Sequence, residues 1–152
     1  MKLIAHRGNI NGPDPINENN PEYIEDAISK GYDVEIDIRY ETKTDSFFLG
    51  HDDPQYIVNI LWLCKFRENL WIHCKNIDAL YTFSANTNGY NYFWHEEDSY
   101  ALTNAGYIWA FPGKSYNSRS IIVMPEKTNI NLSDIRAYNC FGVCSDYVGK
   151  IK

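Results

Sequence analysis

The sequence contains no long hydrophobic run. A helix needs about 18 consecutive apolar residues to span a bilayer, whereas the longest candidate, Tyr56 to Cys64, is shorter and contains Asn59. The first residues, Met1 to His6, also lack an apolar stretch long enough for a secretory signal. We therefore expect no membrane span and a cytoplasmic location.

Positive charge is scarce as well. The chain has 14 Lys and Arg against 20 Asp and Glu, which gives a net charge of −6 at pH 7. Binding to a nucleic-acid backbone depends on clustered Lys and Arg, so we expect no nucleic acid among the partners. A few local cations are still sufficient to bind the single phosphate of a small molecule.

Cysteine is limited to Cys64, Cys74, Cys140 and Cys144. The chain has no Cys-x-x-Cys pair, which is the spacing typical of structural zinc sites. Cys140 and Cys144 could share one face of a strand. Free buried thiols in a reducing compartment are the interpretation that we favour.

The overall composition is that of an ordinary globular protein. The chain has 152 residues, of which 44% are hydrophobic and 22% are charged. These values are typical of a folded domain that buries a full core. No linker, repeat or low-complexity tract interrupts the sequence, so we expect one domain over residues 1–152.

Strand-like and helix-like segments alternate along the chain. Asn20 and Pro21 predict the start of a helix, as a cap followed by proline at the first helical position, and Gly31 predicts its end. Such alternation indicates a parallel sheet. Strands are expected over residues 3–6, 33–39, 47–51, 70–75, 90–95, 107–111, 120–124 and 141–145, and helices over 21–30, 54–68, 78–85 (with a turn over 86–89), 97–104 and 133–138.

Two acids within one strand decide which parallel fold we expect. Glu35 and Asp37 alternate with Val34, Ile36 and Ile38, so the acids face the side opposite to the apolar residues. A doubly wound sheet buries both faces with apolar residues, whereas a barrel accepts polar side chains at the mouth that holds its active site. Because the chain is shorter than the about 250 residues typical of such barrels, we predict a reduced TIM-type (β/α) barrel. It would have seven or eight mostly parallel strands and shortened or missing helices.

Three polar motifs lie in or after the early apolar runs: His6-Arg7-Gly8, Glu35-Ile36-Asp37 and Gly50-His51-Asp52. Two carboxylates about 7 Å apart along a strand can hold a hard divalent cation, and two imidazoles can move protons near pH 7. Each residue also has a structural interpretation, as a core histidine or as an acid on a solvated strand face. Their combination favours phosphodiester chemistry.

With Glu18-Asn19, these motifs resemble the glycerophosphodiester phosphodiesterase family, within the larger group of phospholipase C-like phosphodiesterase barrels. Beyond residue 52 the similarity is weaker: residues 71–75 (Trp-Ile-His-Cys-Lys) and 142–146 (Gly-Val-Cys-Ser-Asp) resemble later strands of the family's barrel. In the family's reaction the substrate's own hydroxyl attacks phosphorus, and water then opens the cyclic phosphate.

The resemblance implies a role for each matched residue, which would make the protein a metal-assisted phosphodiesterase of a glycerophosphodiester-like small molecule. The implied acid–base pair is His6 and His51. Arg7 and Lys75 would contact phosphate. The roles implied for the acids are metal binding by Glu35 and Asp37 and support from nearby Glu18.

His73 is the main departure from the family's pattern, because it stands where the family usually has a third acidic metal ligand. Mg²⁺ and Ca²⁺, the metals first expected, prefer oxygen ligands, whereas imidazole suits Mn²⁺, Zn²⁺ or iron. Three outcomes stay open at this stage. The site could bind a softer metal, hold a hard metal with two carboxylates and water, or have no tight metal site.

His95 is a further candidate for the mouth of the barrel, and Glu126 and Asp146, which also follow strands, are weaker ones. Two alternative functions remain beside hydrolysis. The protein could be a phosphodiester lyase that releases the cyclic phosphate, or a degenerate barrel that binds a phosphorylated ligand without turnover. The sequence leaves the oligomeric state open.

Overall fold

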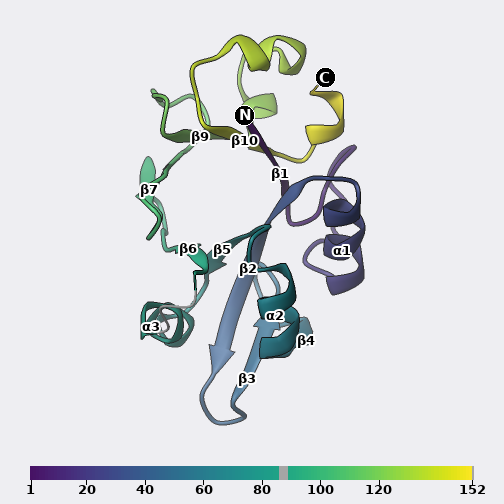
Figure 1. Ribbon diagram of the computed structural model, residues 1–152, viewed down its shortest axis with the longest axis vertical. Coiled ribbons are helices and arrows are strands. Elements are labelled where there is room, and N and C mark those ends of the chain that lie inside the picture. The colour runs from purple at the N-terminus through teal and green to yellow at the C-terminus, as the bar shows by residue number, and fades with distance from the viewer. Residues whose placement is uncertain (86–88, 152) are drawn as a thin grey trace.

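The computed structural model describes residues 1–85 and 89–151, which form a sheet of ten strands curled on itself (Figure 1). Residues 86–88, where most of a turn is expected, lie outside the described residues. The strands are β1 Lys2–His6, β2 Asp33–Glu41, β3 Ser46–Leu49, β4 Tyr56–Val58, β5 Leu70–Cys74, β6 Asn91–Phe93, β7 Tyr100–Leu102, β8 Ile108–Ala110, β9 Ser120–Val123 and β10 Gly142–Ser145. The helices are α1 Pro21–Ser29, α2 Ile60–Phe66 and α3 Ile77–Ala85, with 3₁₀ turns η1 Pro125–Lys127, η2 Leu132–Ala137 and η3 Val148–Lys150.

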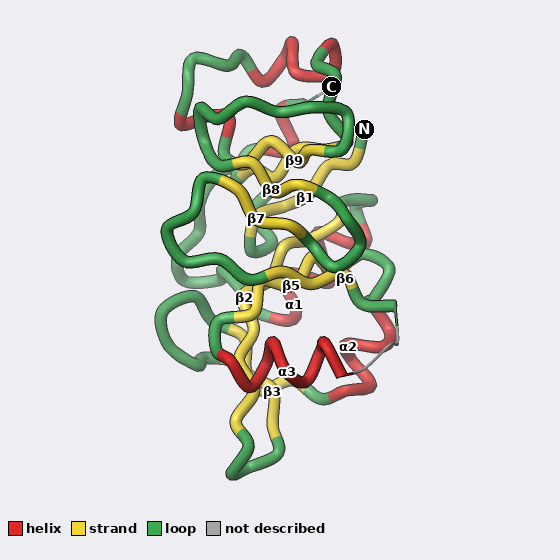
Figure 2. Tube along the Cα trace, turned by 90° about the vertical axis from the view of Figure 1, so that its left-hand side faces the viewer, coloured by secondary structure: helices red, strands yellow, loops and turns green. Residues whose placement is uncertain are grey.

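The sheet is mixed. Its strands run in the order β4-β3-β2-β1-β10-β9-β8-β7, while β5 and β6 extend from the other side of β2. Six neighbouring pairs are parallel and three are antiparallel. Figure 2 shows the strands stacked along the long axis, with the N- and C-terminal ends close together at one end of the molecule. Strand β1 therefore lies between β2 and β10 in the middle of the curl.

The prediction of a reduced TIM-type (β/α) barrel is wrong. A TIM barrel is a closed ring of parallel strands, each followed by a helix, but no ladder joins β6 to β7 or β8 within the described ranges. An antiparallel extension, β3 and β4, branches from β2. Among the described residues an α-helix follows only β1, β4 and β5. The chain between β6 and β9 is too short and too rich in strands to supply the missing helices.

Two predicted helices also differ from the structure. The segment expected to be helical over 54–68 first forms β4, and α2 begins only after the Asn59 side chain caps it by accepting from Trp62 N at 2.9 Å. The helix expected over 97–104 is instead β7, which pairs antiparallel with β8. Its turn ends at Gly106, whose φ of 81° favours glycine. Short apolar runs lie on both sides of that turn, Tyr100–Leu102 and Ile108–Ala110, and their antiparallel pairing outweighed the acidic helix-start signal.

The other predicted elements form close to the expected positions. Helix α1 begins as predicted, with Pro21 in its first turn and the Asn20 side chain accepting from Glu22 N at 3.0 Å. Strands β1, β2, β5 and β10 lie within the expected ranges or extend them by one or two residues. The expected 133–138 helix is the 3₁₀ turn η2. The helix expected over 78–85 is α3.

The core has separate parts on the two faces of the sheet. On the outer face, the apolar residues of β2 pack under all three helices. On the inner face, a second cluster fills part of the interior of the curled sheet. Its members include Ile4, Trp71, Phe93, Trp109 and Ile121. Polar residues that continue along the same inward-facing rows, such as Glu35 and His73, are also buried. The inner face thus changes from apolar packing to a polar site.

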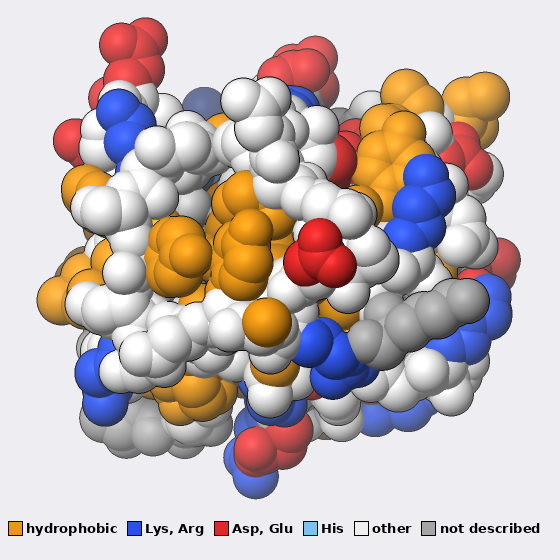
Figure 3. Space-filling view, turned by 90° about the horizontal axis from the view of Figure 1, so that it is seen from above, with side chains coloured by type: hydrophobic (Ala, Val, Ile, Leu, Met, Phe, Trp, Pro, Cys, Tyr) orange, Lys and Arg blue, Asp and Glu red, His pale blue; other side chains and the backbone are white. Residues whose placement is uncertain are grey.

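No helix in the described part of the chain is long and apolar enough to cross a membrane. On the face shown in Figure 3, Lys and Arg side chains are scattered among acidic and polar ones instead of forming one basic patch. All four cysteines are free, and Cys74 and Cys144 are buried, although Cys64 is exposed.

Candidate active site

Strand register brings the sequence-predicted residues together. His6 of β1 pairs in register with Glu35 of β2, and Asp37 of β2 pairs with His73 of β5. Because alternate residues of a strand face the same side, Glu35 and Asp37 both point inward beside these two histidines. Four candidate residues from three strands therefore form one compact array.

The array lines a cavity of about 390 Å³. Glu18 does not line this cavity but contacts it through Arg7. The other eight predicted site residues are brought together, because all of them line the cavity: His6, Arg7, Glu35, Asp37, His51, His73, Lys75 and His95. The structure thus places these nine residues at this cavity or one contact away from it. Of the two weaker candidates, Asp146 contacts His6, whereas Glu126 contacts Ser145 and Asp146 outside the lining.

His6 is oriented by Asp146. Its Nδ1 lies 2.7 Å from Asp146 Oδ1, and its Nε2 lies 3.9 Å from Glu35 Oε2 on the cavity side. Burial alone would lower the pKa of His6, but the hydrogen bond to Asp146 and the charge of Glu35 outweigh it and raise that pKa above 6.5. Asp146 in turn accepts from Asn9 Nδ2 at 2.8 Å. A carboxylate on Nδ1 leaves Nε2 as the nitrogen that exchanges protons with the cavity.

His51 also has a carboxylate at Nδ1. That nitrogen lies 3.1 Å from Asp37 Oδ2 and 2.6 Å from Arg7 Nη2, so it donates to the carboxylate in one tautomer and accepts from the guanidinium in the other. Arg39 fixes the loop that carries His51 by donating to the backbone carbonyls of Gly50, His51 and Asp52. Both predicted acid–base histidines therefore have Nδ1 against an acid.

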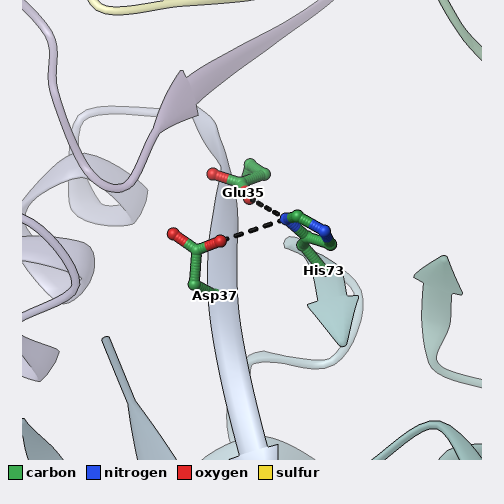
Figure 4. A group of neighbouring side chains, drawn as sticks. All are labelled: Glu35, Asp37 and His73. Atoms are coloured by element: carbon green, nitrogen blue, oxygen red, sulfur yellow. Dashed lines mark ion pairs between the residues drawn. The ribbon is translucent and has the colours of Figure 1, made fainter. Parts of the chain in front are cut away.

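Glu35, Asp37 and His73 form the candidate metal site (Figure 4). One potential ligand atom from each lies within 4.8 Å of the other two. His73 Nδ1 lies 3.0 Å from Asp37 Oδ1 and 3.8 Å from Glu35 Oε1. All three side chains are buried, with exposed fractions between 1% and 6%. Two carboxylates on β2 and one imidazole on β5 thus point at a common position.

The two carboxylates differ in their electrostatic surroundings. Burial, then the nearby charge of Asp37, raises the pKa of Glu35 above its usual value. Burial alone would also raise the pKa of Asp37, but contacts with His51, His73 and Arg7 hold it well below its usual range. Asp37 is therefore ionised at neutral pH, while a negative charge on Glu35 calls for a further cation nearby.

The donor atoms fit a bound divalent cation. His73 Nε2 lies 3.4 Å from the carbonyl oxygen of His95, which can only accept, so in the neutral ring Nε2 carries the hydrogen and Nδ1 carries the lone pair. Among the described residues no hydrogen bond reaches the buried Asp37 Oδ1. In that neutral tautomer a lone pair and an unsatisfied carboxylate oxygen face each other, as ligands around a metal do, whereas a protonated ring donates from Nδ1 to Asp37 Oδ1 at 3.0 Å.

Side chains missed by the sequence reasoning hold these groups in place. Asn19 donates from Nδ2 to Asp37 Oδ2 at 3.1 Å and accepts from Asp37 N at 2.9 Å. Asn9 bridges Asp146 and Glu18, and Glu18 accepts from Arg7 Nη1 at 3.0 Å. Asn19 follows Glu18 in the motif that resembles the family, which is a signal for it. Asn9 and Arg39 have no comparable sequence signal, because their partners come from register and loop packing.

The opposite wall of the cavity is largely apolar, lined by Trp94, Trp109, Phe111, Pro112, Val123 and Met124. His95 lies between the two walls, where its ring stacks on His73 with centroids 4.3 Å apart. Burial, followed by the charge on His73, lowers the pKa of His95 to about 4. His95 is therefore neutral at pH 7 and suits a packing role better than proton transfer.

Comparison of the chain with known protein families, curated proteins and solved structures finds no match. The resemblance to glycerophosphodiester phosphodiesterases consequently rests on the sequence motifs alone.

Proposed function

We propose that this protein is a metal-assisted phosphodiesterase that acts on a glycerophosphodiester-like substrate. The observation that carries the proposal is the convergence of two kinds of groups on one cavity. Two imidazoles, His6 and His51, each have Nδ1 against a carboxylate, and a three-donor metal cluster lies between them. Buried ionisable groups gathered around one cavity are typical of functional sites and are not needed for packing a core.

The proposed chemistry needs two proton transfers. A hydroxyl oxygen of the substrate attacks phosphorus as one imidazole takes the hydroxyl proton, and a new P–O bond forms. The P–O bond to the leaving alcohol breaks as the other imidazole donates a proton to its oxygen. In hydrolysis, water opens the resulting cyclic phosphate with the two histidines in reversed roles. His6 and His51 suit these steps because each has Nδ1 on an acid, while Nε2 has only a longer contact, 3.9 Å to Glu35 Oε2 for His6 and 3.7 Å to Asp52 Oδ1 for His51.

Two basic side chains suit the phosphate. Lys75 lines the cavity with its Nζ 3.8 Å from Asp37 Oδ1, and the Arg7 Nε lies 3.1 Å from Asp37 Oδ2. Both can therefore turn a positive charge toward a phosphoryl oxygen without leaving Asp37 unpaired. A divalent cation held by Glu35, Asp37 and His73 would supply further Lewis-acid polarisation of that oxygen.

The test is turnover of a panel of glycerophosphodiesters, each with Mg²⁺, Ca²⁺, Mn²⁺ or Zn²⁺. His6→Ala and His51→Ala should each lower kcat/KM by about 10²–10⁴-fold, which is the usual contribution of a general acid or base. Lys75→Ala should lower it as well, whereas Lys114→Ala, at an exposed lysine outside the cavity lining, should not. Full activity in both histidine variants would overturn the acid–base assignment.

The products separate the remaining alternatives. A persistent cyclic phosphate would make the protein a lyase, and a phosphomonoester would make it a hydrolase. Binding of a diester without turnover under any metal would favour a degenerate binding protein and overturn the enzyme proposal.

A further inference from the structure

We infer that His73 makes this site selective for borderline divalent cations such as Zn²⁺ and Co²⁺ over Mg²⁺ and Ca²⁺. The inference rests on the proposed metal site and reverses the preference for Mg²⁺ or Ca²⁺ expected from sequence. It concerns the choice of cation, which is separate from whether the cavity cleaves a diester.

The first support is that contacts on the His73 ring hold it in an orientation that suits a metal ligand. The ring stacks against Phe93 and His95, with centroid distances of 5.1 and 4.3 Å and interplanar angles of 6° and 11°, and these two rings lie side by side with centroids 6.1 Å apart. The His95 carbonyl accepts from Nε2, which is the outer contact that metal-binding histidines usually make. Because packing fixes the ring, binding a cation at Nδ1 costs little side-chain entropy.

The second support is the spacing of the donors. Ligands about 2.0–2.2 Å from a first-row metal ion lie roughly 3 Å apart when they are adjacent around it. The distance from His73 Nδ1 to Asp37 Oδ1 is 3.0 Å. Ca²⁺ holds six to eight oxygens at about 2.3–2.6 Å. Two carboxylates offer fewer oxygens than this number. The spacing therefore suits a small cation instead of Ca²⁺. Mg²⁺ binds at a similar distance of about 2.0–2.1 Å, so it is the nitrogen donor, and not the spacing, that disfavours Mg²⁺.

The third support is the charge around the cluster. Hard cations bind mainly through the negative charge of their oxygen ligands. Here the charge of Asp37 is shared with Arg7 and Lys75, whose nitrogens lie 3.1 and 3.8 Å from its oxygens. These two cations offset the charge of Asp37 before any metal binds, but Arg7 also pairs with Glu18 at 3.0 Å, so the charge left for a hard cation is mainly that of Glu35. A borderline metal loses less from this, because its bond to imidazole nitrogen does not depend on ligand charge.

The experiment is calorimetric titration of chelator-treated protein with Zn²⁺ and with Mg²⁺, and visible absorption of the Co²⁺ form. His73→Asp tests the choice, because it restores a third oxygen ligand at the same position. Glu68→Gln, at an exposed carboxylate, is the matched control. The ratio of Zn²⁺ to Mg²⁺ affinity should fall by at least about tenfold in His73→Asp and stay unchanged in Glu68→Gln. The Co²⁺ bands should shift in His73→Asp only.

An affinity ratio that His73→Asp leaves within about twofold of the starting protein would overturn the inference. So would Zn²⁺ binding that survives both Glu35→Gln and Asp37→Asn. If His73→Asp fails to fold, NMR of the unsubstituted protein decides the question, because Zn²⁺ should shift the ring resonances of His73 before those of other histidines.

Turnover of the diester in the same samples separates this inference from the proposed function. Turnover of the diester together with a Zn²⁺ to Mg²⁺ affinity ratio that His73→Asp leaves unchanged would support the phosphodiesterase and overturn the selectivity. Tight Zn²⁺ binding through His73 without any turnover would support the selectivity and overturn the phosphodiesterase.

Discussion

At the scale of single residues, one acid orients the ring of each candidate catalytic histidine. Asp146 contacts His6 Nδ1 at 2.7 Å, and Asp37 contacts His51 Nδ1 at 3.1 Å. Both acids are buried and both have pKa values below their usual range, because contacts with the histidines and other donors outweigh the effect of burial. The acids therefore stay charged at neutral pH and orient the two rings.

Replacing Asp146 should change the protonation of His6. The pKa of His6 is raised because the hydrogen bond to Asp146 and the Glu35 charge outweigh burial. Asp146→Asn removes the charge, so the pKa should fall and a smaller fraction of His6 should be protonated at a given pH. NMR titration of the histidine rings in cation-free protein measures this. Asp134→Asn, at an exposed acid of η2, is the control, and an unchanged His6 titration in Asp146→Asn would contradict the account.

At the scale of elements, the loop after β3 determines where His51 lies. Gly50 has a φ of 145°, and a Cβ at this position would lie 2.1 Å from the Asp53 carbonyl oxygen. The same loop accepts three hydrogen bonds from Arg39 of β2. The position of His51 thus depends on a tight turn and on its tether to the neighbouring strand.

Gly50→Ala should therefore displace His51. We expect a loss of stability well above the about 1 kcal/mol of an ordinary Gly-to-Ala change at positive φ, together with a loss of diester turnover. Gly31→Ala is a matched control, since its φ is also positive, at 89°, but no atom lies within 4 Å of the added Cβ. Urea unfolding and kcat/KM measure both effects. Equal losses in the two variants would show that the turn at Gly50 does not position the site.

The elements also show how far the sequence could predict the molecule. Local signals were sufficient for α1, through Asn20 and Pro21, and for the shared face of Glu35 and Asp37, through strand alternation. The contact between His6 and Asp146 joins residues 140 positions apart. It depends on the parallel pairing of β1 with β10, which no local pattern specifies.

The error in the fold has a similar cause. Whether a curled sheet closes depends on which strands meet at its two ends, and that is a property of the whole chain. The segment over 97–104 carries acids typical of a helix start, but its consecutive apolar residues Tyr100, Ala101 and Leu102 pair with β8 instead. Tertiary pairing outweighed local propensity there. The error did not affect the predicted grouping of the site residues. That grouping depends on β1, β2 and β5, and the positions of these strands in the chain were predicted correctly.

At the scale of the whole molecule, one side chain bridges the open ends of the sheet. Asn104, two residues after β7, accepts from Tyr92 N of β6 at 2.8 Å and donates to the Tyr90 carbonyl oxygen at 2.9 Å. The backbone N–H of Asn104 also donates to the Tyr92 carbonyl oxygen, at a distance of 3.0 Å. These contacts hold β6 near β7 where no strand ladder does.

Asn104→Ala should loosen this connection. Losing two side-chain hydrogen bonds should lower the free energy of unfolding by about 1–2 kcal/mol, and the Tyr92 amide should exchange its hydrogen faster. Asn104→Asp keeps the acceptor for Tyr92 N but places a carboxylate oxygen against the Tyr90 carbonyl oxygen, so it should keep the Tyr92 amide protected without restoring stability. Urea unfolding and hydrogen-exchange NMR measure the two effects. Unchanged exchange at Tyr92 in Asn104→Ala would mean that the ends are held by other contacts.

The most direct test of the central claim is ³¹P NMR of a glycerophosphodiester incubated with the cation-loaded protein. We predict that the diester resonance decays and that a cyclic phosphate or a phosphomonoester replaces it, and that a His6→Ala, His51→Ala double variant with an unchanged melting temperature leaves the diester intact. A diester resonance that persists with every substrate and cation tested, or that decays equally with the double variant, would contradict the assignment of this cavity as a phosphodiesterase site.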